Sequence, residues 1–518
     1  MRRGLTARPT PQRCDRPCCR HIARILLSEI PAPVPCHPYH PYQRFGLIAG
    51  PVAALVMLLF FAPPDLAPAG RHVAAMAVWM AIWWASEAAP FAVTALIPLA
   101  FFPLLGIESM KQAAAAYANP VIYLFLGGFV VAMALERWDV HKRIALNIFA
   151  LVGTRARALV GGMMAAAALI SMWIANTSTT LMLLPIAVSI VVVVHDSVQG
   201  LSATQKRNFA IAMVLGLAYG ATIGGVSTLV GTPPNAFFAG FMEETRGMHI
   251  GFAQWMLVGV PVSLVLLPIA WFVLTYLAFP VHFTTSVQTR RHLQDLKRAL
   301  GPVNTPQRRV AMIFAALALA WMFRAQLTAF APLEGLSDAG IAILAALAVF
   351  VMPSGDASQR TLLTWQQAAR LPWGILLLFG GGLSLASAVS GSGLAQWLGT
   401  VLSGLGALHF ALLVLGATAL VIFLTELTSN LATTAAFLPV MAALAVRLDQ
   451  DVMLLAVPVT LAASCAFMLP VATPPNAIAF SSGMVSIPAM VRAGLILNLV
   501  SIVLLFGVSL VLVPLVFG

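Results

Sequence analysis

Residues 231–235 read Gly-Thr-Pro-Pro-Asn, and residues 472–476 read Ala-Thr-Pro-Pro-Asn. Each motif interrupts a long apolar stretch, at about residues 208–241 and 452–482. Two consecutive prolines remove two backbone N–H donors, so a regular helix does not run through them. In a membrane, irregular backbone is tolerated only where protein surrounds it or where it lines a cavity. The two motifs therefore predict a pair of broken helices beside an internal site.

A polar cluster lies in the middle of each of two other apolar stretches. Residues 173–180 read Trp-Ile-Ala-Asn-Thr-Ser-Thr-Thr within 158–194, and residues 425–434 read Thr-Glu-Leu-Thr-Ser-Asn-Leu-Ala-Thr-Thr within 407–443. This pattern favours a re-entrant hairpin that enters and leaves on one side of the membrane. At each tip the second arm begins as a helix, whose free amides and positive end attract an anion. Carbonyl oxygens released at the tip can bind a small hard cation.

These segments form two copies of one unit, which is typical of transporters. Ser171, Asn176, Thr179, Thr180 and Pro185 correspond, 254 residues later, to Thr425, Asn430, Thr433, Thr434 and Pro439. Phe125, Gly127 and Gly128 correspond in the same way to Phe379, Gly381 and Gly382. The Pro-Pro motifs lie 241 residues apart. Five crossings, starting near residues 120, 208, 251, 309 and 336, separate the copies, and an odd number predicts that they are inverted.

The composition requires a membrane. Of the 518 residues, 60% are hydrophobic and only 9% are charged, whereas a soluble domain carries about 25% charged residues. Long apolar runs rather than alternating strands select helices. At about 20 residues per crossing, the chain allows about eleven transmembrane helices. The fold class expected is an all-α polytopic membrane protein with two inverted repeats, each containing a re-entrant hairpin and a broken helix.

The net charge of +12 is explained by membrane orientation better than by nucleic-acid binding. With a cytoplasmic N-terminus, all but five of the 29 Lys and Arg residues face the cytoplasm, the exceptions being Arg71, Lys111, Arg246, Arg324 and Arg447. Cytoplasmic loops of membrane proteins carry such an excess. We therefore expect a multi-pass protein of the bacterial inner membrane, with membrane lipid as a partner and no nucleic acid.

Six parts are expected along the chain. They are a basic, Pro-rich, disordered leader (1–44), N-terminal scaffold helices (45–119), the first repeat (120–280), a cytoplasmic linker (281–308), further scaffold helices (309–372) and the second repeat (373–518). A zinc site in the leader is conceivable, but the spacing fits no standard ligand pattern; its ligands would come from Cys14, Cys18, Cys19, Cys36, His21, His37 and His40. The basic residues between Arg290 and Arg309 could bind lipid headgroups, although a simple linker is the plainer interpretation.

Residues 224–235 (GGVSTLVGTPPN) and 464–476 (SCAFMLPVATPPN) resemble the divalent anion:sodium symporter family. The resemblance extends from about residue 46 to the end of the chain. It implies transport of dicarboxylates, tricarboxylates or sulfate, mostly with sodium. It also implies a homodimer in which a transport domain slides as an elevator along a scaffold domain.

The resemblance further implies which residues bind the ions and the substrate. The first sodium site would use Ser171, Asn176 and Gly231, and the second would use Thr425, Thr428, Asn430 and Ala472. Substrate would contact Asn176, Thr177, Ser429, Asn430 and the loops at Pro233 and Pro474. The family carries a Ser-Asn-Thr triplet at each tip. Here Ala175 and Leu431 replace one hydroxyl residue of each triplet.

The function expected is sodium-coupled import of a small divalent anion, with a C4-dicarboxylate favoured over sulfate. Moving a charge against an inside-negative potential costs about 2.3 kcal/mol per 100 mV, and neither tip has a Lys or Arg to offset a dianion. A sodium-independent anion exchanger is one alternative. A sodium/proton antiporter is another, for which Glu426 is the candidate acid and Glu87 a weaker one. A membrane-embedded enzyme is remote, since the chain has neither His-Glu-x-x-His nor Gly-x-Ser-x-Gly.

Overall fold

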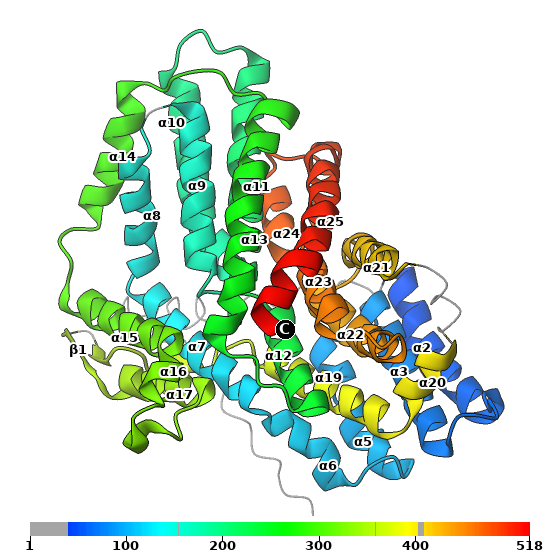
Figure 1. Ribbon diagram of the computed structural model, residues 1–518. Coiled ribbons are helices and arrows are strands. Elements are labelled where there is room, and N and C mark those ends of the chain that lie inside the picture. Colours follow the sequence, from blue (N-terminus) through cyan, green and yellow to red (C-terminus); the bar gives the residue numbers. More distant parts are fainter. Residues whose placement is uncertain (1–39, 154, 358, 402–408) are drawn as a thin grey trace, which may run out of the picture.

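The computed structural model describes residues 40–153, 155–357, 359–401 and 409–518. In this part of the chain nearly every element is a helix (Figure 1), and the one sheet is a hairpin of β1 (Pro353–Asp356) and β2 (Gln359–Thr361). Eight of the described helices are long and apolar enough to cross a membrane, and five shorter apolar helices accompany them. The all-α class predicted from the sequence is confirmed.

The N-terminal helices pack beside one another, and the last of them opens the first repeat. They are α2 (Pro41–Phe60), α3 (Pro68–Ser86), α4 (Phe91–Thr94), α5 (Ile97–Leu104), α6 (Met110–Ala115), η1 (Ala116–Ala118) and α7 (Pro120–Arg137). α2 starts at Pro41 because proline suits the first helical position, so the last four residues of the expected leader are helical. Cys14, Cys18, Cys19, Cys36, His21 and His37 lie outside the described residues, among which no metal-binding group of His, Cys, Asp and Glu occurs.

The first repeat continues with one helical hairpin and one broken helix. Its elements are α8 (Val140–Leu151), α9 (Ala156–Ser171), α10 (Asn176–Ser197), α11 (Ala203–Val226), α12 (Pro233–Arg246), α13 (Phe252–Phe272) and η2 (Val273–Ala278). In Figure 1, α9, α10, α11 and α13 lie side by side. The apolar window of α11 is completely buried, as expected of a helix that is hydrophobic on all sides. α11 is therefore the centre of this half.

The second half repeats the hairpin and the broken helix. Its elements are α14 (Val287–Ala299), α15 (Thr305–Met322), α16 (Arg324–Leu327), η3 (Ala331–Leu333), α17 (Asp338–Val351), α18 (Trp365–Ala368), α19 (Trp373–Gly391), α20 (Leu394–Val401), α21 (Phe410–Thr425), α22 (Asn430–Arg447), α23 (Met453–Ala463), α24 (Pro474–Ser481) and α25 (Ile487–Phe517). Much of the segment expected to be a plain linker, 281–308, is the amphipathic helix α14, whose cationic side chains are exposed.

Equivalent helices of the two copies meet in the interior. The rings of Phe125 on α7 and Phe379 on α19, which the repeat pairs, lie 5.0 Å apart between centroids. Glycine allows the helices to approach closely. A Cβ atom at Gly127 would lie 2.5 Å from the carbonyl carbon of Ala342, so α7 and α17 are in backbone contact there. The repeat is therefore a feature of the packing as well as of the sequence.

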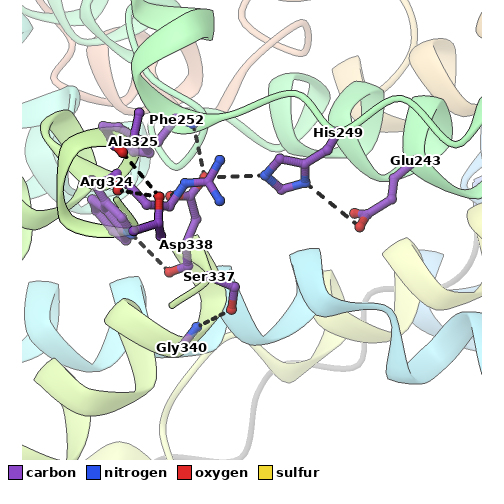
Figure 2. A network of polar contacts seen from close by, with 10 residues as sticks. Glu243, His249, Phe252, Arg324, Ala325, Ser337, Asp338 and Gly340 are labelled. Carbon is purple, nitrogen blue, oxygen red and sulfur yellow. Dashed lines mark hydrogen bonds and ion pairs between the residues drawn. The ribbon is translucent and has the colours of Figure 1, made fainter. Parts of the chain in front are cut away.

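A polar cluster joins the turn between α12 and α13 to α16 and α17 (Figure 2). Arg324 Nε lies 3.0 Å from Asp338 Oδ1, and the amide of Phe252 donates to Asp338 Oδ2 at 3.1 Å. The His249 ring lies between two acids, with Nε2 3.9 Å from Asp338 Oδ2 and Nδ1 3.8 Å from Glu243 Oε1. This cluster lines a cavity of about 370 Å³.

Candidate functional site

Each hairpin tip is the start of a helix. α10 begins at Asn176 and α22 at Asn430, and neither start has a side-chain cap. The first amides bonded within these helices are those of Thr179 and Thr433. The three amides before each of them have no partner within the helix, and they lie at its positive end. The sequence predicted that the second arm of each hairpin begins as a helix at its tip.

Each broken helix resumes at its Pro-Pro pair. α12 begins at Pro233 and α24 at Pro474, each after a threonine in extended conformation with φ −142°. Proline is favoured at this position because the first amides of a helix have no internal partner. The Thr-Pro-Pro sequence therefore ends the irregular segment at the same point in both copies.

The asparagine of each motif holds the irregular segment together. Asn235 Nδ2 donates to the carbonyls of Gly225 at 3.3 Å and Thr228 at 2.8 Å. Asn476 Nδ2 donates to the equivalent carbonyls, those of Ala466 at 3.2 Å and Leu469 at 3.0 Å. Both asparagines are fully buried. Their role is to satisfy carbonyls that the helix break leaves without partners.

Both tips and both Pro-Pro motifs open onto one cavity of about 780 Å³. All six residues expected to contact substrate line it: Asn176, Thr177, Pro233, Ser429, Asn430 and Pro474. In the described part of the chain no Lys, Arg or His lines this cavity. The N-termini of α10, α12, α22 and α24 therefore supply the positive potential, because no side chain does.

Sequence reasoning missed the opposite wall of the cavity. Phe125 and Phe129 of α7 and Leu378 of α19 line it, together with Phe91 of α4. Phe125 stood out only as a member of the repeat, and periodicity alone does not distinguish a cavity wall from core. These residues are apolar, and most of the polar groups that line the cavity belong to the tips and the Pro-Pro motifs.

The residues of the first expected sodium site lie together around the Asn176 side chain. With its amide turned so that Nδ2 faces them, Asn176 donates to Ser171 Oγ at 2.5 Å and to the carbonyl oxygens of Gly231 and Ala221 at 3.2 Å. The Asn176 amide satisfies both carbonyl oxygens when no ion is bound, and a bound cation would replace Nδ2 once the amide turned Oδ1 towards it. Hard cations take oxygen ligands, so these residues fit sodium. Ala221 was not among the expected ligands.

The second expected site is arranged around Asn430 and Thr425. Thr425 Oγ1 lies 2.9 Å from Asn430 Oδ1 and also 2.9 Å from the carbonyl oxygen of Ala463. Ala472 lines the cavity nearby. Thr428 is different, because its hydroxyl lies 2.6 Å from that of Thr433 and donates to Leu424 within the same hairpin.

The two candidate acids occupy different environments. Glu87 lies at the end of α3 with a left-handed φ of 48°, is exposed, and lines the cavity. Glu426 is 3% exposed and is not among the residues that line the cavity. Its carboxylate accepts hydrogen bonds from the amides of Phe467, Met468 and Leu469. The sequence placed Glu426 beside the tip but gave no sign of these amides.

The fold and the site together define a multi-pass membrane transporter, with two half-copies around a cavity that has no Lys, Arg or His among its described lining residues. The chain belongs to the sodium:sulfate symporter family, whose transmembrane-region model matches residues 43–517. This match confirms the family resemblance drawn from the Pro-Pro motifs.

Characterised relatives are transporters. The sodium-dependent dicarboxylate transporter SdcS of Staphylococcus aureus (strain USA300) is 39% identical over 484 residues, which is 93% of each chain. The protein of the same name from the bovine strain RF122 / ET3-1 is 40% identical over the same length. The prediction of a transporter rather than an enzyme is confirmed.

Two solved structures share the fold at low sequence identity. MtrF of Neisseria gonorrhoeae, described as illuminating a class of antimetabolite efflux pumps, has a TM-score of 0.56 and 12% identity, covering 92% of this chain and 95% of its own. The YdaH transporter of Alcanivorax borkumensis has a TM-score of 0.56 and 14% identity, with coverages of 81% and 89%.

Proposed function

We propose that this protein imports a small divalent anion together with sodium across the bacterial inner membrane. The observation that carries the proposal is the cavity of about 780 Å³ where the N-termini of α10, α12, α22 and α24 meet without any Lys, Arg or His among its described lining residues. Helix N-termini favour anions, and the oxygen atoms around Asn176 and Asn430 favour a hard cation.

The cargo we favour is a C4-dicarboxylate, ahead of sulfate. The relatives that match most of the chain are named for sodium-dependent dicarboxylate transport. A dicarboxylate has two anionic ends, and the hairpin helices α10 and α22 offer two separate sets of free amides. Asn176 and Thr177 would contact one carboxylate, and Ser429 and Asn430 the other, with the loops at Pro233 and Pro474 beside them.

Sodium supplies both the driving force and the missing positive charge. Moving a dianion into an inside-negative cell costs about 2.3 kcal/mol per charge for each 100 mV of membrane potential. Two sodium ions make import electroneutral. The proposed ligands are Ser171, Asn176 and Gly231 for one ion, and Thr425, Thr428, Asn430 and Ala472 for the other.

The motion we propose is an elevator. The cavity has one wall from the tips and Pro-Pro motifs and another from α4, α7 and α19. A site between two such units is exposed to each side in turn when one unit slides past the other. We assign the hairpins, the broken helices, α13 and α25 to the moving unit, and α7, α15–α17 and α19 to a fixed unit that also forms the homodimer. We place the N-terminus in the cytoplasm, and the distribution of Lys and Arg supports this orientation.

The deciding experiment is uptake of radiolabelled succinate into liposomes containing the purified protein. We expect uptake to require an inward sodium gradient, and to be inhibited more by malate than by sulfate or citrate. Uptake that ignores sodium but requires an internal anion would identify an exchanger instead. Sodium-driven proton efflux without anion uptake would identify an antiporter.

A further inference from the structure

We propose that Glu426 and Tyr219 are positioning residues for the second sodium site. They fix the unwound segment, defined here as residues 464–473 between α23 and α24. This inference rests on the proposed function, because it concerns the sodium affinity of the same site. It gives Glu426 a role other than that of a proton carrier.

The Glu426 carboxylate holds three consecutive amides of the unwound segment. Oε1 accepts from Phe467 at 2.7 Å and from Met468 at 2.9 Å, and Oε2 accepts from Leu469 at 3.0 Å. Asn498 Nδ2 on α25 also donates to Oε1, at 2.7 Å. In the described part of the chain no Lys, Arg or His forms an ion pair with this carboxylate. Charge-assisted bonds of this kind are about twice as strong as neutral ones.

Tyr219 holds the same segment from the other copy of the repeat. Its hydroxyl donates to the carbonyl of Phe467 at 2.7 Å, and the two rings pack edge to face with centroids 5.2 Å apart. Tyr219 is fully buried on α11, two residues before Ala221, whose carbonyl accepts from the turned Asn176 amide at the first expected sodium site. Phe467 is thus bonded through its amide to Glu426 and through its carbonyl to Tyr219.

The unwound segment leads directly to the proposed ligands. Ala472 follows Leu469 by three residues, and Thr425 directly precedes Glu426. Thr425 also bonds to the carbonyl of Ala463, at the end of α23. A carboxylate that fixes residues 467–469 therefore fixes both sides of the second site, and its negative charge favours a cation there.

The first copy lacks this arrangement, which makes the assignment specific to the second site. Position 172, equivalent to Glu426, is methionine. In the first copy the hydrogen bond runs from the irregular segment to the hairpin: the hydroxyl of Thr228 donates to the carbonyl of Met172. Loss of Glu426 should therefore affect one sodium site and leave the other intact.

The test measures sodium activation of succinate uptake by Glu426→Gln and Tyr219→Phe proteoliposomes. Gln keeps the shape but turns an amide N–H towards the amide of Leu469, so we expect the half-saturating sodium concentration to rise about tenfold. Tyr219→Phe loses one neutral hydrogen bond, and we expect about a threefold rise. The succinate KM at saturating sodium should change less than twofold in both. Because both residues bond to Phe467, the effects of the two substitutions on sodium activation should be less than additive in the double variant.

Matched controls are Tyr117→Phe, which loses a bond to the carbonyl of Ala95, and Glu334→Gln, an exposed acid of the smaller cavity. Neither should alter sodium activation. The inference is overturned if sodium activation is unchanged in both test variants, or if the half-saturating concentrations of sodium and succinate rise by the same factor.

If Glu426→Gln does not fold, the test uses Tyr219→Phe and Asn498→Ala instead. The measurement is the rise in Tm that sodium produces in detergent. We expect this rise to be smaller in both variants than in the wild-type protein. A rise in Tm equal to that of the wild-type protein would overturn the inference. A wild-type protein that neither binds sodium nor needs it for uptake would overturn the proposed function itself.

Discussion

Asn176 and Asn430 each contribute to two kinds of binding. Both residues line the cavity in the first turn of α10 and α22, while their side-chain amides contact the hydroxyls of Ser171 and Thr425. One residue therefore connects the place proposed for an anion with the place proposed for a cation. Such sharing explains how binding of one ligand can favour the other, since both depend on one side-chain position.

Leu431 offers a direct test of the missing hydroxyl. Its side chain is buried and lines the cavity one residue after the start of α22. Leu431→Thr adds a donor next to the proposed anion, which is worth about 1 kcal/mol. We expect the succinate KM to fall about fivefold, measured in proteoliposomes at saturating sodium. Leu438→Thr, buried on the same helix away from the cavity, is the control. An unchanged KM would place Leu431 outside the substrate contacts.

At the scale of elements, signals within one stretch of sequence predicted where helices begin. Contacts between distant stretches were not predicted. The starts of α10 and α22 at the tip asparagines, and of α12 and α24 at Pro-Pro, follow from residues adjacent in sequence. The bonds of Glu426 join residues 41 to 72 positions apart, and no pattern within one stretch reveals such pairs. The helix α14 inside the expected linker was missed because its composition is strongly charged.

The contact between α11 and the first tip should tolerate no added atom. A Cβ atom at Gly225 would lie 2.4 Å from Asn176 Oδ1 and 3.0 Å from the carbonyl oxygen of Gly231. Gly225→Ala therefore displaces the first expected sodium site, and overpacking costs about 1–3 kcal/mol. We expect sodium-dependent uptake to fall more than tenfold.

The control for this substitution is Gly416→Ala on α21, where a Cβ atom would meet nothing within 4 Å. Uptake should be unchanged there. Normal sodium activation in Gly225→Ala would mean that the cluster at Asn176 is not a sodium site.

At the scale of the whole molecule, the cluster in Figure 2 connects the proposed moving and fixed units. The Glu243 carboxylate, 3.8 Å from Nδ1, raises the pKa of His249 above its ordinary value of 6.5, while burial and Arg324 oppose the rise. Asp338 also favours the charged ring, and Glu334 lines the same cavity. The folded state thus prefers the protonated ring.

This preference has a definite sign with pH. Because the folded-state pKa is raised, the stabilisation is fully present below about pH 6.5 and is lost as pH rises through the folded-state pKa. We expect the difference in Tm between the wild-type protein and His249→Gln to shrink between pH 6 and pH 8.5. A difference that stays constant over this range would show that His249 does not titrate in this contact.

The elevator proposal predicts that a covalent link across the cluster of His249, Arg324 and Asp338 stops transport. His249→Cys with Asp338→Cys, in a background without the five native cysteines, would be joined by a flexible bifunctional thiol reagent. We expect succinate turnover to fall more than tenfold while sodium binding persists. Arg324→Cys with Asp338→Cys joins two positions of the fixed unit, and should remain active after the same treatment. Full activity of the first cross-linked pair would exclude sliding at this contact.

The absence of Lys, Arg and His from the described walls of the large cavity has a consequence for unloading. A permanent cation would hold a dianion on either side of the membrane and would slow its release. If positive charge arrives with sodium, as we propose, cargo is held weakly once the ions dissociate. Low sodium in the cytoplasm is then sufficient to empty the carrier, and a carrier without its ions has little tendency to take anions back out.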